Sequence, residues 1–175
     1  MYCTPTLLAD AKLTRELAQA ATPERMPIPS DEAMDAVLRG TSTVGMDADE
    51  IEAAEAALVV VNNALQAASE LIDGYLVMRK PTPYTVPLSP VPGIVVTWCR
   101  WIARYLLHKD RVNTQEATDP VVRDYKEALR FLAMLRDGEF SLGADDPLPA
   151  PSSGMPQHCG PARVFTTDTL KDFGL

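Results

Sequence analysis

Five prolines between two helical patterns constrain the fold of this chain more than any other sequence feature. One helix is predicted to run in through Tyr75 and Leu76, and a second to run out through Trp98 and Ile102. Proline lacks a backbone N–H and biases the residue before it toward extended geometry, so neither helix can continue through this stretch. Residues 80–92 are therefore predicted to form a stiff, extended arm between two helices. The five prolines are Pro81, Pro83, Pro87, Pro90 and Pro92.

Before the arm, apolar or small residues recur at steps of three and four, which is the pattern of one helical face. Asp47 followed by Glu50 has the spacing of a capping box, so a helix is predicted from there to about Arg79. Val59 and Val60 widen the apolar surface beyond one stripe and indicate contacts on more than one side. The stripe itself contains Ile51, Ala54, Leu58, Val61, Leu65, Ala68, Ile72 and Tyr75.

Shorter helical patterns flank these elements. After the arm, an apolar face predicts one helix, and Asp119 followed by Pro120 starts another that Gly138 closes. Near the N-terminus, short helices are predicted after Thr4 and Thr14, and a third between Ser30 and Gly40. Because narrow apolar stripes must be buried against each other, we predict an all-α fold, a small helical bundle over residues 1–143. The face after the arm contains Val95, Trp98, Cys99, Ile102 and Leu106.

Residues 144–175 have a different composition. The first part, 144–163, contains five prolines and few apolar groups, so it is predicted to be an extended tail that packs no core. Apolar residues then reappear, and this pattern is typical of a short recognition segment at 163–175. The candidate docking residues are Arg163, Val164, Phe165, Leu170 and Phe173.

Composition and charge exclude several classes of function. Lys and Arg number 16 against 24 Asp and Glu, and the net charge of −8 disfavours sequence-independent binding to nucleic acid. The longest apolar run, residues 56–61, is too short to span a bilayer, and the first ten residues do not have the pattern of a secretory signal. Three widely spaced cysteines indicate reduced thiols in a cytoplasm.

No pattern of catalytic or cofactor-binding residues is found. The sequence contains no phosphate-binding glycine loop, nucleophile elbow, CxxC or HExxH motif, so we predict neither an enzyme nor a cofactor. His158 and Cys159 are the closest approach to a metal pair, and only Cys3 and the distant His108 could join them. Since a zinc site normally needs about four ligands, we predict no metal site.

Several other side chains allow two interpretations. Asp73 and Arg79 could form a structural pair or be solvated, and the solvated state is favoured; Arg79 is also a possible interface residue. Trp98 is assigned to the core, whereas Trp101 lies off the apolar stripe and is as consistent with an interface as with the core. The arm could be a plain surface loop, but its length and its apolar side chains favour docking onto a neighbour. The arm residues predicted to be exposed for docking are Tyr84, Val86 and Leu88.

Ordered blocks of residues resemble a known family. They are Ile72-Asp73-Gly74-Tyr75-Leu76, Arg79, Tyr84, Pro87-Leu88, Val91-Pro92, Ile102-Ala103-Arg104-Tyr105-Leu106 and, near the C-terminus, the run from Arg163 to Leu170. They resemble the adaptor, or head-completion, protein of Mu-like phages and prophages, over about residues 46–143. Two departures stand out: residues 80–83 separate Arg79 from Tyr84, and Trp101 occupies a position that is usually acidic. Residues 22–45 look like an insertion relative to that family.

The resemblance implies a structural protein of the virion neck, made in the host cytoplasm and assembled beneath the portal. It implies a closed ring of about twelve copies with head-to-tail interfaces. The implied partners are the portal protein and the adjoining neck or tail-terminator protein, with no membrane. Genomic DNA would pass through the lumen of the ring without specific binding, which an acidic subunit favours.

An alternative from a different class remains open. The chain could be a monomeric helical regulatory or binding module that uses its C-terminal segment as a ligand for another protein. Formation of a ring on a portal separates the two hypotheses, because a regulator has no reason to assemble in that way.

Overall fold

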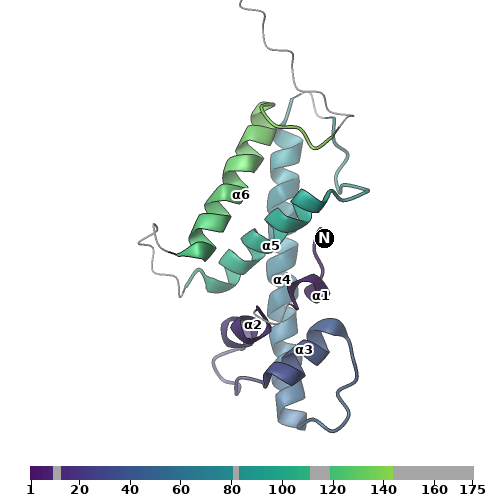
Figure 1. Ribbon diagram of the computed structural model, residues 1–175, viewed down its shortest axis with the longest axis vertical. Helices are drawn as coiled ribbons and strands as arrows, with labels where there is room; N and C mark the ends of the chain where they lie inside the picture. The colour runs from purple at the N-terminus through teal and green to yellow at the C-terminus, as the bar shows by residue number, and fades with distance from the viewer. Residues whose placement is uncertain (10–12, 81–82, 111–118, 144–175) are drawn as a thin grey trace, which may run out of the picture.

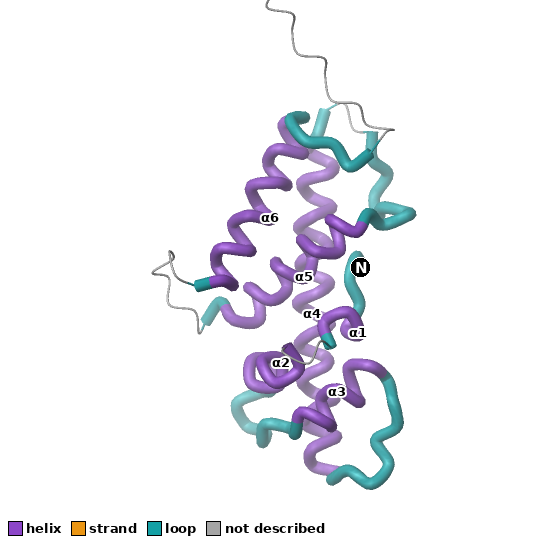
Figure 2. The backbone as a smooth tube through the Cα atoms, viewed as in Figure 1, coloured by secondary structure: helices purple, strands orange, loops and turns teal. Residues whose placement is uncertain are grey.

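The computed structural model describes residues 1–9, 13–80, 83–110 and 119–143, and all regular secondary structure within these ranges is helical. The predicted all-α fold is therefore confirmed. The helices, shown in Figures 1 and 2, are α1 (Pro5–Leu8), α2 (Leu13–Ala21), α3 (Asp31–Arg39), α4 (Ala48–Met78), α5 (Gly93–His108) and α6 (Pro120–Asp137).

Helix α4 is the central element of the fold. Its 31 residues extend over about 45 Å, and each of the other five helices contacts it. In Figure 1, α5 crosses α4 obliquely and α6 lies beside the upper half of α4, while α1, α2 and α3 surround its lower half. Helices of the same chain pack against α4 from several directions, which accounts for the partly buried Val60, whereas Val59 stays 58% exposed.

Several helix ends have the predicted capping contacts, although the Thr4 side chain makes no capping hydrogen bond at the start of α1. The Ser30 hydroxyl accepts a hydrogen bond from the Ala33 N–H at 3.3 Å at the start of α3, and the Asp119 carboxylate accepts one from the Val121 N–H at 2.8 Å at the start of α6. Gly138 ends α6 with a φ of 81°, a left-handed conformation that glycine adopts without strain. The predicted cap at Thr14 is wrong, since α2 begins one residue earlier and Thr14 is buried within it.

The core between α4, α5 and α6 contains the side chains that the apolar stripes predicted. Trp98 is 1% exposed, and its ring stacks on Phe131 with centroids 5.9 Å apart. Ile102 and Leu132 are fully buried beside it, and burial of side chains of this size stabilises the fold by about 1.5–3 kcal/mol each. The assignments of Trp98 and Cys99 to the core are confirmed.

The N-terminal third contributes more to the core than predicted. Tyr2, Cys3, Leu17 and Met34 are buried in the same cluster as the long helices, so the bundle is not limited to three elements. Helix α3 lies inside the segment 22–45 and packs on α4 and α2, although the assignment of that segment as an insertion stays a prediction.

A polar contact joins α2 to the end of α5. The Glu16 carboxylate accepts two hydrogen bonds from the Arg104 guanidinium, at 2.6 and 2.7 Å, and its Oε1 lies 2.7 Å from His108 Nε2. Burial would raise the pKa of Glu16, but the hydrogen bonds and charge of Arg104, together with His108, outweigh burial and lower it. Glu16 therefore stays ionised and fixes the orientation of the two helices.

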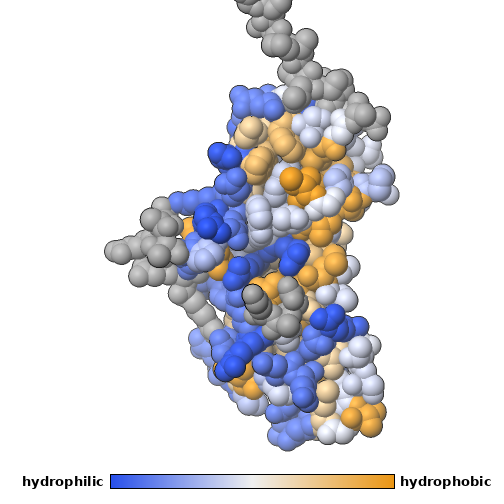
Figure 3. All heavy atoms as spheres, viewed as in Figure 1, coloured by the Kyte–Doolittle hydropathy of each residue, from blue (hydrophilic) through white to orange (hydrophobic). Residues whose placement is uncertain are grey.

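Apolar side chains are unevenly distributed on the face drawn in Figure 3. They gather over the upper right of that view, where the arm meets the start of α5, while hydrophilic side chains dominate the left. Among the described residues, no helix has both the length and the apolar content needed to cross a membrane.

Candidate functional site: the proline-rich arm

The described part of the arm, residues 83–92, connects α4 to α5 without regular secondary structure. The peptide bonds Val86–Pro87 and Ser89–Pro90 are cis. Because proline has no backbone N–H to donate, a segment this rich in proline cannot form helical hydrogen bonds of its own. The arm therefore needs other contacts to keep one position. Three sets of contacts with residues outside the arm hold it in place.

The first contact comes from the N-terminus. The Tyr2 hydroxyl accepts a hydrogen bond from the Leu88 N–H at 3.0 Å and donates one to the Asp73 carboxylate on α4. The backbone N–H of Tyr2 donates to the Ser69 hydroxyl at 3.0 Å, which fixes the N-terminal segment on α4. Burial, together with the hydrogen bond to Asp73, raises the pKa of Tyr2 to about 12, so the hydroxyl remains a donor at neutral pH. Tyr2 thus ties the middle of the arm to α4.

The second contact is made by Arg79, immediately after α4. Its Nη1 donates to the carbonyls of Leu135, at 3.3 Å, and Phe140, at 2.9 Å. Both carbonyls lie at or just beyond the end of α6, where a cation is also favourable for the helix dipole. The guanidinium lies over the Tyr84 ring, 5.6 Å from its centroid. Arg79 therefore links the start of the arm to the end of α6.

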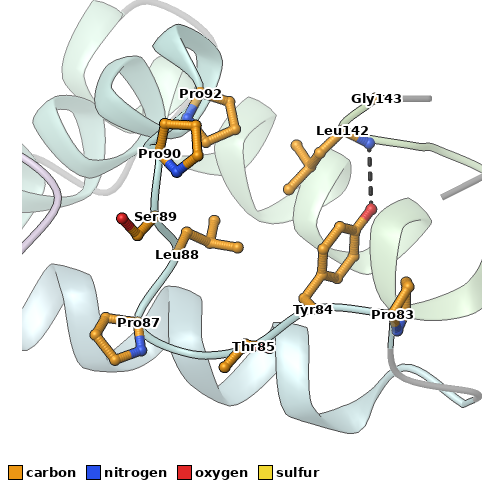
Figure 4. A pocket seen from close by; sticks show the side chains of 10 residues that line it. All are labelled: Pro83, Tyr84, Thr85, Pro87, Leu88, Ser89, Pro90, Pro92, Leu142 and Gly143. Carbon is orange, nitrogen blue, oxygen red and sulfur yellow. Dashed lines mark hydrogen bonds between the residues drawn. The ribbon is translucent and has the colours of Figure 1, made fainter. Parts of the chain in front are cut away.

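The third contact closes the arm against residues 138–143. The backbone N–H of Leu142 donates to the Tyr84 hydroxyl at 3.2 Å, as Figure 4 shows. Between them lies a groove of about 440 Å³, lined mainly by arm residues and by Leu142 and Gly143. Leu88 and Leu142 point toward each other from its opposite walls. The surface of the groove is largely apolar, so it can hold an apolar side chain, and its polar side chains are those of Tyr84, Thr85 and Ser89.

The structure corrects the predicted exposure of the arm. Tyr84, Val86 and Leu88 were expected to lack a core position, but they are half-buried and pack against the core of their own chain. The preference for a solvated Arg79 is also wrong, because this side chain is only 5% exposed. The expected alternative, a pair between Asp73 and Arg79, is replaced by separate partners for each. Whether these residues contact another protein stays a prediction.

Trp101 is also half-buried and lies on a different surface. Together with Leu8, Leu13, Leu17 and residues of α5, it lines a small cavity of about 130 Å³ between α5 and the N-terminal helices. Its proposed interface role stays a prediction. The candidate docking residues Arg163, Val164, Phe165, Leu170 and Phe173 lie outside the described residues, as do His158 and Cys159.

Two residues that position the arm could not be predicted from the sequence. Tyr2 was not singled out, because an isolated tyrosine near an N-terminus belongs to no periodic pattern. Leu142 follows the last helix and belongs to no periodic apolar pattern that would indicate which way its side chain points. A polar or apolar residue that acts through a single contact distant in sequence gives no local signal.

The described residues contain no group of three or more His, Cys, Asp and Glu side chains that could hold a metal ion. Cys3 is buried as a free thiol, and burial raises its pKa to about 12, so it is protonated at neutral pH. The arm and its groove, built from proline rings, apolar side chains and backbone, are suited to contact with another polypeptide.

Comparison with known proteins identifies relatives among phages and prophages. The Mu-like prophage FluMu protein gp36 of Haemophilus influenzae is 42% identical over 86 residues, which cover 49% of this chain and 55% of that protein. Gene product J of Escherichia phage Mu is 30% identical over 95 residues, covering 54% of this chain and 61% of that protein. The chain thus spans somewhat more than half the length of these relatives.

No solved structure matches this chain. The family described as Bacteriophage Mu, Gp36 matches residues 2–158, which include every helix in the described ranges, the arm and the first part of the tail. The match therefore covers both the helical body and the candidate site. The chain belongs to the bacteriophage Mu Gp36 family.

Proposed function

We propose that this protein is a structural component of the virion neck, a head-tail adaptor that forms a closed ring beneath the portal. The chain belongs to a bacteriophage family, and the proposal adds a specific role in the virion. The ring would contain about twelve copies, joined by head-to-tail interfaces of one repeated kind. Its partners would be the portal protein above and the adjoining neck or tail-terminator protein below.

The distribution of exposed apolar side chains is the observation that supports this role most directly. Nine large apolar residues are exposed among the described residues, and four of them lie in the arm or close to its ends in the chain: Val77, Met78, Val91 and Ile94. Scattered exposed apolar residues are normal on a monomer, whereas a concentration around one element marks an interaction surface. We infer that the two ends of the arm contact a neighbouring protein.

The fixed position of the arm supports the same role. Tyr2, Arg79 and Leu142 hold it against α4 and the end of α6, so little conformational freedom remains to be lost when a neighbour binds. A ring multiplies this advantage, because the same contact is repeated at each interface. The acidic net charge fits a lumen through which DNA passes without being held.

Electron microscopy of the full-length protein mixed with the portal of the same phage tests the proposal. We expect a ring of this protein, with the symmetry of the portal's lower face, to be visible on the portal particles. Portal particles with no added density, together with a monomer by light scattering, would contradict the proposal. The same result would favour the helical regulatory or binding module.

A further inference from the structure

We propose that the groove beneath the arm binds residues 163–170 of a neighbouring copy of the same chain, with Phe165 inserted between Leu88 and Leu142. The inference rests on the proposed ring, because it assigns one of the contacts that would join adjacent subunits. The groove and the segment that fills it are both parts of this sequence, but in the assembly they belong to different copies of the chain.

The chemistry of the groove fits an aromatic or aliphatic side chain. Its walls carry four proline rings, the Tyr84 ring and two leucine side chains. The hydroxyls of Thr85 and Ser89 also line it, and no lining residue is ionised. Its volume of about 440 Å³ lies within the range of about 300–1,000 Å³ found for pockets that hold small ligands. A charged or small polar occupant would leave these apolar walls in contact with water.

The backbone of the arm is also available for pairing. Within the described part of the chain, the N–H groups of Thr85, Val86 and Val91 donate no hydrogen bond, and Leu88 donates only to the Tyr2 hydroxyl. An extended peptide laid along such a segment can use these donors, as in strand addition. The groove therefore favours an occupant that is extended and carries an apolar side chain.

The C-terminal segment of this chain has both properties. Val164-Phe165-Thr166-Thr167 consists of β-branched and aromatic residues, which favour extended backbone. It is the first apolar run after Gly143, which itself lines the groove, so the body ends where the receptor surface lies. Each subunit would therefore present a groove and, close beside it, the start of its own tail.

The sequence between Gly143 and Arg163 favours a neighbouring copy over the same chain. These 19 residues reach at most roughly 65 Å when extended. Five of them are prolines, which favour extended, semi-rigid backbone and disfavour a tight return to the starting point. Such a linker would carry Phe165 away from the groove of its own subunit and toward that of the next.

A photo-crosslinking experiment on assembled rings tests this inference. Full-length protein with p-benzoylphenylalanine in place of Phe165 is mixed with ¹⁵N-labelled protein that lacks the probe, assembled on portal and irradiated. Mass spectrometry should find the unlabelled peptide around position 165 joined to the labelled peptide containing residues 83–92. The matched control carries the probe at Gln157, where we expect at least tenfold less crosslinking to the arm.

Two variants in the labelled chain make the test specific. Leu142→Asp places a carboxylate in the groove wall and should reduce the crosslink to the arm at least tenfold, whereas Val44→Asp, at a distant residue that is 93% exposed, should not. Crosslinks confined to the unlabelled chain would overturn the inference in favour of docking within one subunit. Crosslinks to portal alone, on rings seen by microscopy, would overturn it while the adaptor role stands.

Discussion

The Tyr2 hydroxyl lies 3.0 Å from the backbone nitrogen of Leu88 and accepts its hydrogen bond, although 86 positions separate the two residues. The same hydroxyl donates to Asp73, so one oxygen connects the N-terminus, the arm and α4. An extended segment rich in proline has few backbone hydrogen bonds of its own, and its position therefore depends on such distant partners. The arm is a fixed element of the fold because Tyr2 is buried beside it.

Replacement of Tyr2 by phenylalanine should therefore loosen the arm, while the aromatic ring of the side chain stays buried in the core. The change removes the acceptor of the Leu88 N–H and the donor to Asp73, so we expect a loss of about 1–3 kcal/mol in the free energy of unfolding. Amide hydrogen exchange at Leu88 should also become faster.

Tyr125→Phe is the matched control for this prediction. Tyr125 stacks on Tyr105 with ring centroids 3.9 Å apart, and its hydroxyl makes no hydrogen bond among the described residues. The free energy of unfolding of the Tyr125→Phe variant should differ from that of the wild type by less than about 0.5 kcal/mol. Equal effects of the two substitutions would show that the hydroxyl of Tyr2 has no special part in holding the arm.

Arg79→Met should destabilise the end of α6. Methionine keeps an apolar stem but leaves the carbonyls of Leu135 and Phe140 without their charged donor. Since one hydrogen bond from a charged group contributes about 1.5–3 kcal/mol, urea denaturation should show a loss of at least about 2 kcal/mol. Arg123→Ala, at a side chain that is 73% exposed, should cause a much smaller change. Comparable losses for both would contradict the structural role of Arg79.

The helices could be predicted because their signals are local. Ser30 and Gly40 bound α3, and Asp119, Pro120 and Gly138 bound α6, each through a capping contact within a few residues. The apolar stripe likewise assigned Trp98 and Ile102 to the core, since burial follows the helical period. These parts of the fold need no information from distant segments.

The arm could be located from the sequence but not oriented. Its prolines exclude a helix, but nothing nearby indicates that Tyr2 and Leu142 would hold it against the body. Arg79 illustrates the same limit: an arginine next to a helix end is usually solvated, and it is buried here because two carbonyls of a distant segment accept its hydrogen bonds. Contacts of this kind depend on tertiary structure and leave no periodic trace.

Ile102→Ala tests the packing of α5 against α4 and α6. The side chain is fully buried, so its truncation leaves a cavity and should cost about 2–5 kcal/mol, measured by chemical denaturation. Ile28→Ala removes the same atoms from a side chain that is 61% exposed and should cost much less. Similar losses at the two sites would contradict the packing of α5 against α4 and α6.

Glu16→Gln should give a loss of stability that depends on pH. At pH 7 the variant weakens the charged hydrogen bonds from Arg104, and we expect a loss of about 1.5–3 kcal/mol. The folded-state pKa of Glu16 is lowered, so its contribution is complete above the unfolded pKa of about 4.3 and is lost as pH falls through the folded value. The difference between wild type and variant should therefore shrink below about pH 4.3. At pH 7, the exposed Glu55→Gln should change the free energy of unfolding much less than Glu16→Gln does.

The last prediction concerns the surface around the arm, where Val91 and Ile94 are 38% and 41% exposed. Val91→Asp combined with Ile94→Asp places two carboxylates on this surface without removing a buried side chain. If a neighbouring subunit covers the surface, the carboxylates must lose their water without gaining a charged or hydrogen-bonding partner. Assembly should therefore be strongly weakened.

We expect the double variant to keep the circular dichroism spectrum of the wild type but to form no ring on portal particles by negative-stain microscopy. Val44→Asp adds a charge at an exposed apolar residue far along the chain from the arm and should assemble normally. Normal rings from the double variant would remove this surface from the interface. Loss of rings in both variants would point instead to a general effect of added negative charge, which higher salt would reverse by screening.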